Sequence, residues 1–176
     1  MKSGYAENDN VALHHLIMEP GEVWRAEEDC TQEKVGIKVP NAWLNYGCCA
    51  GELLVDHPTL PQKVHYAAHK DATDCMLDPA ERATFQSNTD GPVEYYSFLP
   101  VDLSLLHANN HRHILAAGEM LDIRAPAYAG VVRGSVRNFR DPTSLYPQYT
   151  LFTITEAARL VAETDDTFIA VIYREA

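Results

Sequence analysis

Short runs of apolar residues, separated by polar and turn-forming residues, recur along the whole chain. Many of these runs alternate apolar with polar side chains or are rich in valine, isoleucine and aromatic residues, which is typical of β-strands with at least one buried face. Proline, glycine and aspartate mark turns between the runs. The pattern predicts strands over residues 11–18, 34–39, 52–55, 93–99, 101–106, 119–125, 130–139, 149–154 and 167–174.

Two segments have apolar residues at helical spacing instead. Residues 155–164, TEAARLVAET, have Thr155 at the position of a helix N-cap and a partial apolar face. Residues 60–76 carry apolar residues at intervals of three and four, and a strand followed by a loop is the alternative for this segment. A chain with many strands and one or two short helices predicts a mainly β fold, either a sandwich or a barrel.

The length of the chain favours a single domain. A chain of 176 residues is within the usual range for one domain, and its sequence shows no internal repeat that would divide it. The first ten residues are polar, so we expect a flexible N-terminus over 1–10. We expect a single β-barrel domain over 11–176.

The charge of the chain narrows the classes of partner. The 14 Lys and Arg residues stand against 25 Asp and Glu residues, which gives a formal charge of −11, so we expect neither nucleic acid nor a membrane as a partner. From residue 91 onward the chain has arginine but no lysine, and several arginines between 124 and 140 lie close together in sequence. Because a guanidinium holds a carboxylate or phosphate with two parallel hydrogen bonds, this cluster favours a small anionic partner; surface ion pairs are the alternative.

The N-terminal region and the cysteines indicate a compartment. The apolar run at 11–18 is too short for a membrane span or the core of a signal peptide. The four cysteines, Cys30, Cys48, Cys49 and Cys75, lack the C-x-x-C spacing that suits zinc. We therefore expect reduced thiols in a cytoplasmic protein.

The strongest candidate for a chemical site is the stretch HANNHRHILAAGEMLDI, residues 107–123. Side chains two residues apart on a strand share a face, so His111 and His113 are placed to reach one metal ion. The alternation with Leu121 and Ile123 puts Glu119 on the inward face, where a carboxylate has to be paired, protonated or bound to metal. Two histidines and a carboxylate suit a divalent transition metal such as Fe, Zn, Ni or Mn. We therefore predict His111, His113 and Glu119 as metal ligands and Glu119 as the catalytic residue, with a polar turn around the histidines as the alternative.

This stretch resembles the first motif of the cupin superfamily, which places a His-x-His pair and a glutamate on adjoining barrel strands. The resemblance implies a β-barrel or jelly roll with a metal held by His111, His113 and Glu119. The sequence departs from the family pattern in its spacing, because five residues separate His113 from Glu119 where the family usually has three or four. No histidine follows His113, so the ligand of the family's second motif has no counterpart on this alignment.

A second alignment competes with the first. The segment 117–132, AGEMLDIRAPAYAGVV, has the glycine, apolar strand and proline of the family's second motif. The first motif then lies upstream, near His65 and His69. These two histidines are four residues apart and would share one face of a helix, with Asp71 or Asp74 nearby. The metal site is therefore predicted either at His111 and His113 or at His65 and His69.

A pair of arginines is the candidate for substrate binding. In GVVRGSVRNF, residues 130–139, Arg133, Ser135 and Arg137 share one face of the predicted strand. If this face points inward, Arg133 and Arg137 form a substrate-binding wall for a small carboxylate. If it points outward, it is a solvated surface.

Two functional hypotheses follow from these patterns. The first is a cupin-like protein that binds a small anionic molecule and acts on it as a metal-dependent enzyme. The second is a metal-free β-barrel that works in binding or assembly, which the missing later histidine favours. Exposed strand edges favour a homodimer in either case.

Overall fold

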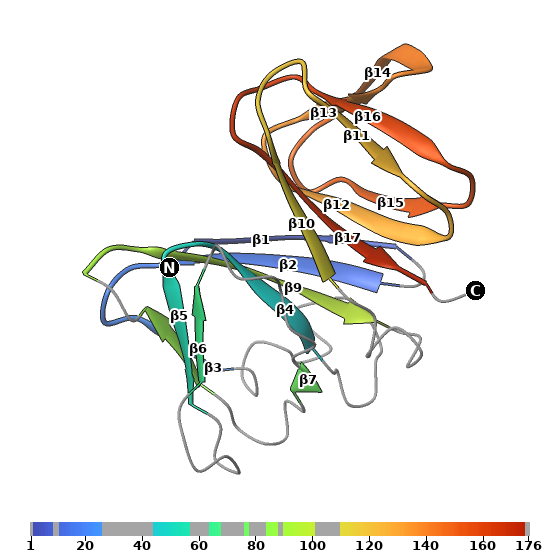
Figure 1. The fold of residues 1–176 in the computed structure, drawn as a ribbon. Helices are drawn as coiled ribbons and strands as arrows, with labels where there is room; N and C mark the ends of the chain where they lie inside the picture. Colours follow the sequence, from blue (N-terminus) through green and yellow to red (C-terminus); the bar gives the residue numbers. More distant parts are fainter. Residues whose placement is uncertain are drawn as a thin grey trace. The chain divides into compact units, whose positions relative to one another are not determined.

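The structure is a computed structural model, and it describes residues 2–8, 11–25, 44–56, 64–67, 76–77, 84–87, 90–100 and 110–174. Every regular element among these residues is a β-strand (Figure 1). The chain divides into two compact units, Met1–His107 and Ala108–Ala176, each of which is described by itself. The described part of the chain contains no helix that could cross a membrane.

The first unit contains two β-sheets. Its described strands are β1 (Lys2–Glu7), β2 (Val11–Met18), β3 (Val23–Arg25), β4 (Leu44–Ala50), β5 (Glu52–Asp56), β6 (Val64–Ala67), β7 (Met76–Leu77), β8 (Thr84–Ser87) and β9 (Val93–Pro100). One sheet has the order β1-β2-β9-β4-β7 and the other has the order β3-β8-β5-β6. All pairings within them are antiparallel.

The second unit also contains two antiparallel sheets. Its described strands are β10 (Asn110–Leu115), β11 (Met120–Ile123), β12 (Ala127–Arg133), β13 (Val136–Asn138), β14 (Asp141–Tyr146), β15 (Leu151–Ile154), β16 (Ala158–Ala162) and β17 (Thr167–Tyr173). One sheet has the order β10-β17-β12-β15 and the other has the order β11-β16-β13-β14. Figure 1 shows these strands in yellow to red.

The two units share one topology. Counting from β2 in the first unit and from β10 in the second, the strands follow the order 1-8-3-6 in one sheet and 2-7-4-5 in the other. This is the eight-stranded jelly roll, which is built from Greek-key connections. Strand β1 extends the first jelly roll by pairing with β2. The structure thus has two jelly rolls where the sequence predicted one barrel over 11–176.

The same turn follows the first strand of each jelly roll. Gly21 and Gly118 have φ angles of 85° and 84°. Each glycine precedes a glutamate whose carboxylate accepts a hydrogen bond from a backbone N–H three residues earlier, at 2.9 Å for Glu22 and 2.8 Å for Glu119. The repeat is therefore present in local backbone geometry, although only the Gly-Glu pair marks it in the sequence.

A second glycine recurs between the third and fourth strands. Gly51 and Gly134 both have a φ of 77°, and both lie against the start of the last strand of their own jelly roll. A Cβ atom at Gly134 would lie 2.5 Å from the Thr167 hydroxyl oxygen and 3.0 Å from Thr167 Cα. Only glycine combines this φ with such a close approach.

The core of the second unit lies between its two sheets. Alternate side chains of each strand point into it, as the period of a β-strand requires. The buried members of this core are Leu115, Leu121, Ile123, Ala127, Ala129, Val131, Val136, Ile154, Leu160, Ala162, Ile169 and Val171. His111 and His113 precede Leu115 at intervals of two and therefore share its face of β10.

The strand predictions are largely confirmed, and the helix predictions are wrong where the structure tests them. Residues 155–164 contain β16, where Leu160 and Ala162 are buried. Burial with a period of two, between neighbours on both sides, outweighs the local helix propensity. Residues 64–67 form β6, which agrees with the strand-and-loop alternative for 60–76. The predicted strands at 34–39 and 101–106 lie outside the described residues.

The N-terminus also differs from expectation. Residues 2–7 form β1 and pair with β2 along its length, from Lys2 with Ile17 to Glu7 with Ala12. The polar composition of the segment suggested a flexible end. An exposed edge strand can be polar, however, because its stability comes from the hydrogen bonds of the ladder.

Candidate functional site

The two predicted histidine ligands lie on one face of β10. His111 is exposed, whereas His113 is half-buried and pairs with Ile169 of β17. The His113 Nε2 atom is buried and has no hydrogen-bond partner among the described residues. Burial lowers the pKa of His113, and the nearby His111 lowers it further. The neutral imidazole is thus the favoured form of His113.

Glu119 does not join these histidines. It is exposed, it lies in the turn before β11 begins, and its carboxylate accepts the hydrogen bond from the Ala116 N–H. The alternation that places Leu121 and Ile123 inward does not extend to Glu119, because the turn interrupts the strand. No group of three or more His, Cys, Asp and Glu side chains in the described ranges could hold a metal ion. The predicted set of three ligands does not fit a metal centre.

The alternative histidine pair is described only in part. His65 lies in β6 opposite Leu54, so the segment around it is a strand and not the predicted helix. His69 lies outside the described residues, as do Asp71 and Asp74.

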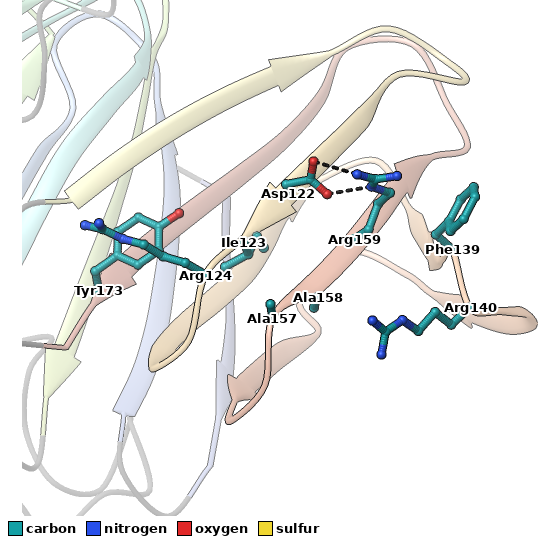
Figure 2. A pocket seen from close by; sticks show the side chains of 9 residues that line it. All are labelled: Asp122, Ile123, Arg124, Phe139, Arg140, Ala157, Ala158, Arg159 and Tyr173. Atoms are coloured by element: carbon teal, nitrogen blue, oxygen red, sulfur yellow. Dashed lines mark hydrogen bonds and ion pairs between the residues drawn. The ribbon is translucent and has the colours of Figure 1, made fainter. Parts of the chain in front are cut away.

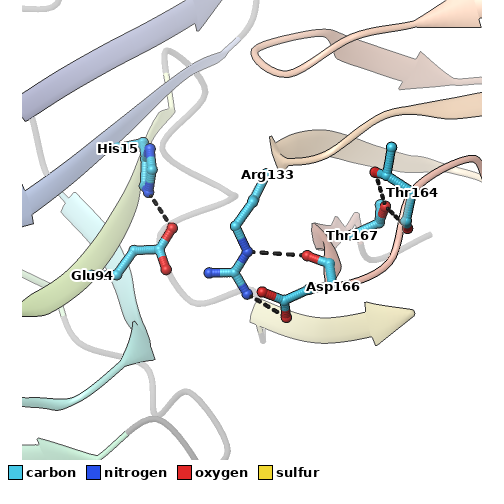
Figure 3. A network of polar contacts seen from close by, with 6 residues as sticks. All are labelled: His15, Glu94, Arg133, Thr164, Asp166 and Thr167. Atoms are coloured by element: carbon cyan, nitrogen blue, oxygen red, sulfur yellow. Dashed lines mark hydrogen bonds and ion pairs between the residues drawn. The ribbon is translucent and has the colours of Figure 1, made fainter. Parts of the chain in front are cut away.

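The two arginines predicted to bind substrate are held by acids, and Figure 3 shows the first of these pairs, Arg133 with Asp166. Arg133 ends β12 and donates to the Asp166 carboxylate at 2.9 Å and to its backbone carbonyl at 3.0 Å. Arg137 lies on β13 and pairs with Glu163, which raises the pKa of the guanidinium. Gly134 breaks the strand between the two arginines, so they do not form one continuous wall. The structure agrees with the ion-pair alternative for both side chains.

A pocket in the second unit contains a different set of arginines (Figure 2). Its volume is about 610 Å³. It lies where β11 ends, β16 begins and the turn between β13 and β14 approaches. Its lining residues are Asp122, Ile123, Arg124, Phe139, Arg140, Ala157, Ala158, Arg159 and Tyr173.

One of the three arginines in this pocket is neutralised. Arg159 forms a two-pronged ion pair with Asp122, with nitrogen–oxygen distances of 2.5 and 2.9 Å. Its hydrogen bond lowers the pKa of the Asp122 carboxyl, so this pair stays charged at neutral pH. The Arg159 guanidinium also lies 5.5 Å from the centre of the Phe139 ring.

The other two arginines have no carboxylate partner among the described residues. The Arg124 guanidinium lies 4.6 Å from the centre of the Tyr173 ring, in the geometry of a cation–π contact. Tyr173 in turn makes an edge-to-face contact with His111, with ring centres 5.1 Å apart. The Asn138 side chain accepts a hydrogen bond from Arg140, but this bond comes from the Arg140 backbone N–H and leaves its guanidinium uninvolved. The pocket therefore presents two guanidiniums whose charges nothing described offsets.

The pocket lies in the arginine-rich region that the sequence singled out, but the predicted pair Arg133 and Arg137 does not line it. Arg133, Arg137 and Arg159 find their acids 33, 26 and 37 positions away in the chain. No local pattern indicates such pairings. The spacing within a predicted strand favoured Arg133 and Arg137 as the substrate-binding pair. The arginines that line the pocket without an acid, Arg124 and Arg140, lie just beyond the ends of β11 and β13.

The fold is shared with several solved structures. No family model and no curated protein sequence matches the chain. The protein YhaK from Escherichia coli is similar with a TM-score of 0.62 and 10% identity, over 98% of this chain and 86% of that one. The coconut allergen cocosin is similar with a TM-score of 0.58 and 9% identity, over 98% of this chain and 81% of that one.

The bacterial pirin YhhW from Escherichia coli, in complex with nickel(II), is similar with a TM-score of 0.55 and 10% identity, over 94% of this chain and 82% of that one. The likeness agrees with the mainly β, cupin-like jelly-roll fold that the sequence predicted. The agreement extends over nearly the whole chain in each case. At these identities the likeness concerns the fold, and the chemistry has to be argued from the residues of this chain.

Proposed function

We propose that this cupin-fold protein binds a small anionic molecule in the arginine-lined pocket of its second jelly roll. The observation that carries the proposal is the pair Arg124 and Arg140, which line one pocket without a carboxylate partner among the described residues. By contrast, Arg133 and Arg137 outside the pocket and Arg159 within it each have an acid. In a chain of formal charge −11, two guanidiniums without acids in one concave site favour binding of an anion.

The remaining lining supports a small organic anion. Ile123, Ala157 and Ala158 give the pocket an apolar floor, and Tyr173 and Phe139 add aromatic rings. The volume of about 610 Å³ lies within the usual range for small-molecule sites. An organic carboxylate combines the charge that arginine prefers with carbon that this floor can cover.

Calorimetric titration with a panel of small carboxylates at low salt tests the proposal. We expect binding to the wild type, and a loss of roughly tenfold or more in affinity in Arg140→Gln, because a charge-assisted hydrogen bond is worth about 1.5–3 kcal/mol. Arg137→Gln is the matched control, since Arg137 is paired with Glu163 away from the pocket. Absence of binding to the wild type, or equal losses in both variants, contradicts the proposal.

A metal ion held by His111 and His113 is the second candidate. It is favoured by the buried Nε2 atom of His113, which lacks a hydrogen-bond partner in the described part of the chain, and by the placement of both imidazoles on one face of β10. A neutral imidazole suits Fe, Zn or Ni. Elemental analysis of protein purified without a histidine tag tests this candidate. Metal that is present in the wild type and lost in the His111→Ala/His113→Ala variant supports this metal site. Equal metal content in the two proteins excludes it.

A further inference from the structure

We infer that the ligand of the arginine pocket is an organic dianion whose two anionic groups are separated by an apolar spacer. This inference rests on the proposed function and specifies its ligand. The lining contains three arginines and one aspartate, which leaves a net charge of +2. A ligand with two negative charges neutralises the site, whereas a monoanion leaves one guanidinium without a counter-ion.

The arrangement of the two available guanidiniums adds a requirement of length. Figure 2 shows Arg124 and Arg140 on opposite sides of Ile123, Ala157 and Ala158. Arg124 follows β11, and Arg140 lies in the turn between β13 and β14. A single carboxylate engages one guanidinium with its two oxygens. Two carboxylates joined by a chain of CH₂ groups can engage both guanidiniums while the chain covers the apolar floor.

Two contacts hold these positions in place. The Tyr173 ring lies under the Arg124 guanidinium, and Tyr173 is fixed at the end of β17. The Asn138 side chain accepts a hydrogen bond from the Arg140 N–H and so shapes the turn that carries Arg140. Anchors that are positioned before binding lose less entropy when the ligand arrives, and they discriminate ligands by length.

Asp122 limits the number of anionic groups that the pocket accepts. Its carboxylate accepts hydrogen bonds from Nε and Nη2 of Arg159 and offsets the charge of that guanidinium, so Arg159 is a weaker anchor than Arg124 and Arg140. This arrangement predicts selectivity for two charges over three.

A length series of ligands tests the inference by calorimetry at about pH 7.5, where carboxylates are ionised, and at low salt. The probes are butyrate as the monoanion, succinate, glutarate and adipate as dianions of increasing length, and inorganic phosphate as a compact dianion. We expect one dicarboxylate to bind roughly tenfold or more tightly than butyrate and phosphate, because it alone engages both guanidiniums. Each of Arg124→Gln and Arg140→Gln should reduce its affinity to the level of butyrate, while thermal unfolding shows that the variants are folded.

The outcomes separate the inference from the proposed function. If butyrate binds as tightly as every dicarboxylate and one arginine variant abolishes binding, the site takes a monoanion, and the dianion inference is overturned while anion binding stands. If phosphate binds as tightly as the best dicarboxylate, charge alone determines the affinity, and the inferred spacer is overturned. If no probe binds to the wild type, both claims fail.

Discussion

At the scale of single residues, the arginines of the second jelly roll differ in whether an acid lies beside them. Arg133 and Arg137 are chemically identical to Arg124 and Arg140, and all four lie within a short span of sequence. The first two are paired with Asp166 and Glu163, which approach only after the chain has folded. The sequence could therefore locate the arginine-rich region but not which of its guanidiniums lack an acid.

Asp122 gives a direct test of this account. Replacing it in Asp122→Asn removes the charge that holds Arg159, so we expect anions to bind about fivefold more tightly at low salt, with the gain lost as salt increases. Asp166→Asn is the control, because its partner Arg133 does not line the pocket. Anion titrations of the two variants measure the effect. Equal affinities in Asp122→Asn and the wild type would contradict the role assigned to this carboxylate.

His113 gives a prediction of pH dependence. Its pKa in the folded protein is lowered from 6.5 by burial and by His111, so the unfolded chain binds the additional proton more readily. Stability is then unaffected above about pH 6.5 and decreases as the pH falls below it. We expect the wild type to lose more unfolding free energy between about pH 7 and about pH 5 than His113→Gln, as measured by denaturant titration. Parallel pH profiles would show that His113 has an unshifted pKa.

At the scale of elements, the turns of the two jelly rolls explain why Glu119 looked like a ligand. The Gly-Glu pair that resembles a family motif closes the turn after β10, and Gly21 with Glu22 closes the same turn after β2. A sequence pattern cannot separate a glutamate that is held by a backbone N–H from one that points inward. The strand boundary at Met120 decides the matter, and such boundaries are the least certain feature of a sequence-based assignment.

The structural role of Glu119 is testable through paired substitutions. We expect Glu119→Ala to lose about 0.5–1.5 kcal/mol of unfolding free energy, because the Ala116 N–H loses its acceptor. Glu119→Gln keeps an acceptor oxygen and should remain close to the wild type in stability. Denaturant unfolding and metal content are measured on the same samples. Loss of bound metal in Glu119→Gln without loss of stability would restore Glu119 as a ligand.

Alanine substitutions at two glycines with similar φ angles distinguish the stability cost of a left-handed backbone from the cost of steric crowding. Gly118 has a φ of 84°, and no heavy atom lies within 4 Å of the position that a Cβ would take there, so Gly118→Ala should cost about 1–2 kcal/mol for the left-handed backbone alone. Gly134→Ala meets the same backbone cost and also forces Thr164 and Thr167 apart, which adds about 1–3 kcal/mol. Denaturant unfolding compares the two. A larger loss in Gly118→Ala would contradict the close packing at Gly134.

At the scale of the whole molecule, the mainly β, jelly-roll class was predictable from the sequence, and the division into two jelly rolls was not. Apolar runs such as 11–18 and 167–174 correctly predicted strands, because a strand that is buried on nearly all of its positions leaves a short continuous apolar run in the sequence. Two jelly rolls with the same strand order share little sequence beyond glycines at equivalent turns. Topology depends on which strands pair over long distances, and this information is not local to any segment.

The central claim is that an anion binds between Arg124 and Arg140 and leaves the acid-paired arginines unaffected. Nuclear magnetic resonance of the arginine side-chain Nε–H signals, followed during titration with a dicarboxylate, tests it most directly. The account predicts that the signals of Arg124 and Arg140 shift together and saturate with one dissociation constant, while those of Arg133 and Arg137 stay in place. A response confined to Arg133 and Arg137, or no response from any arginine, would contradict it.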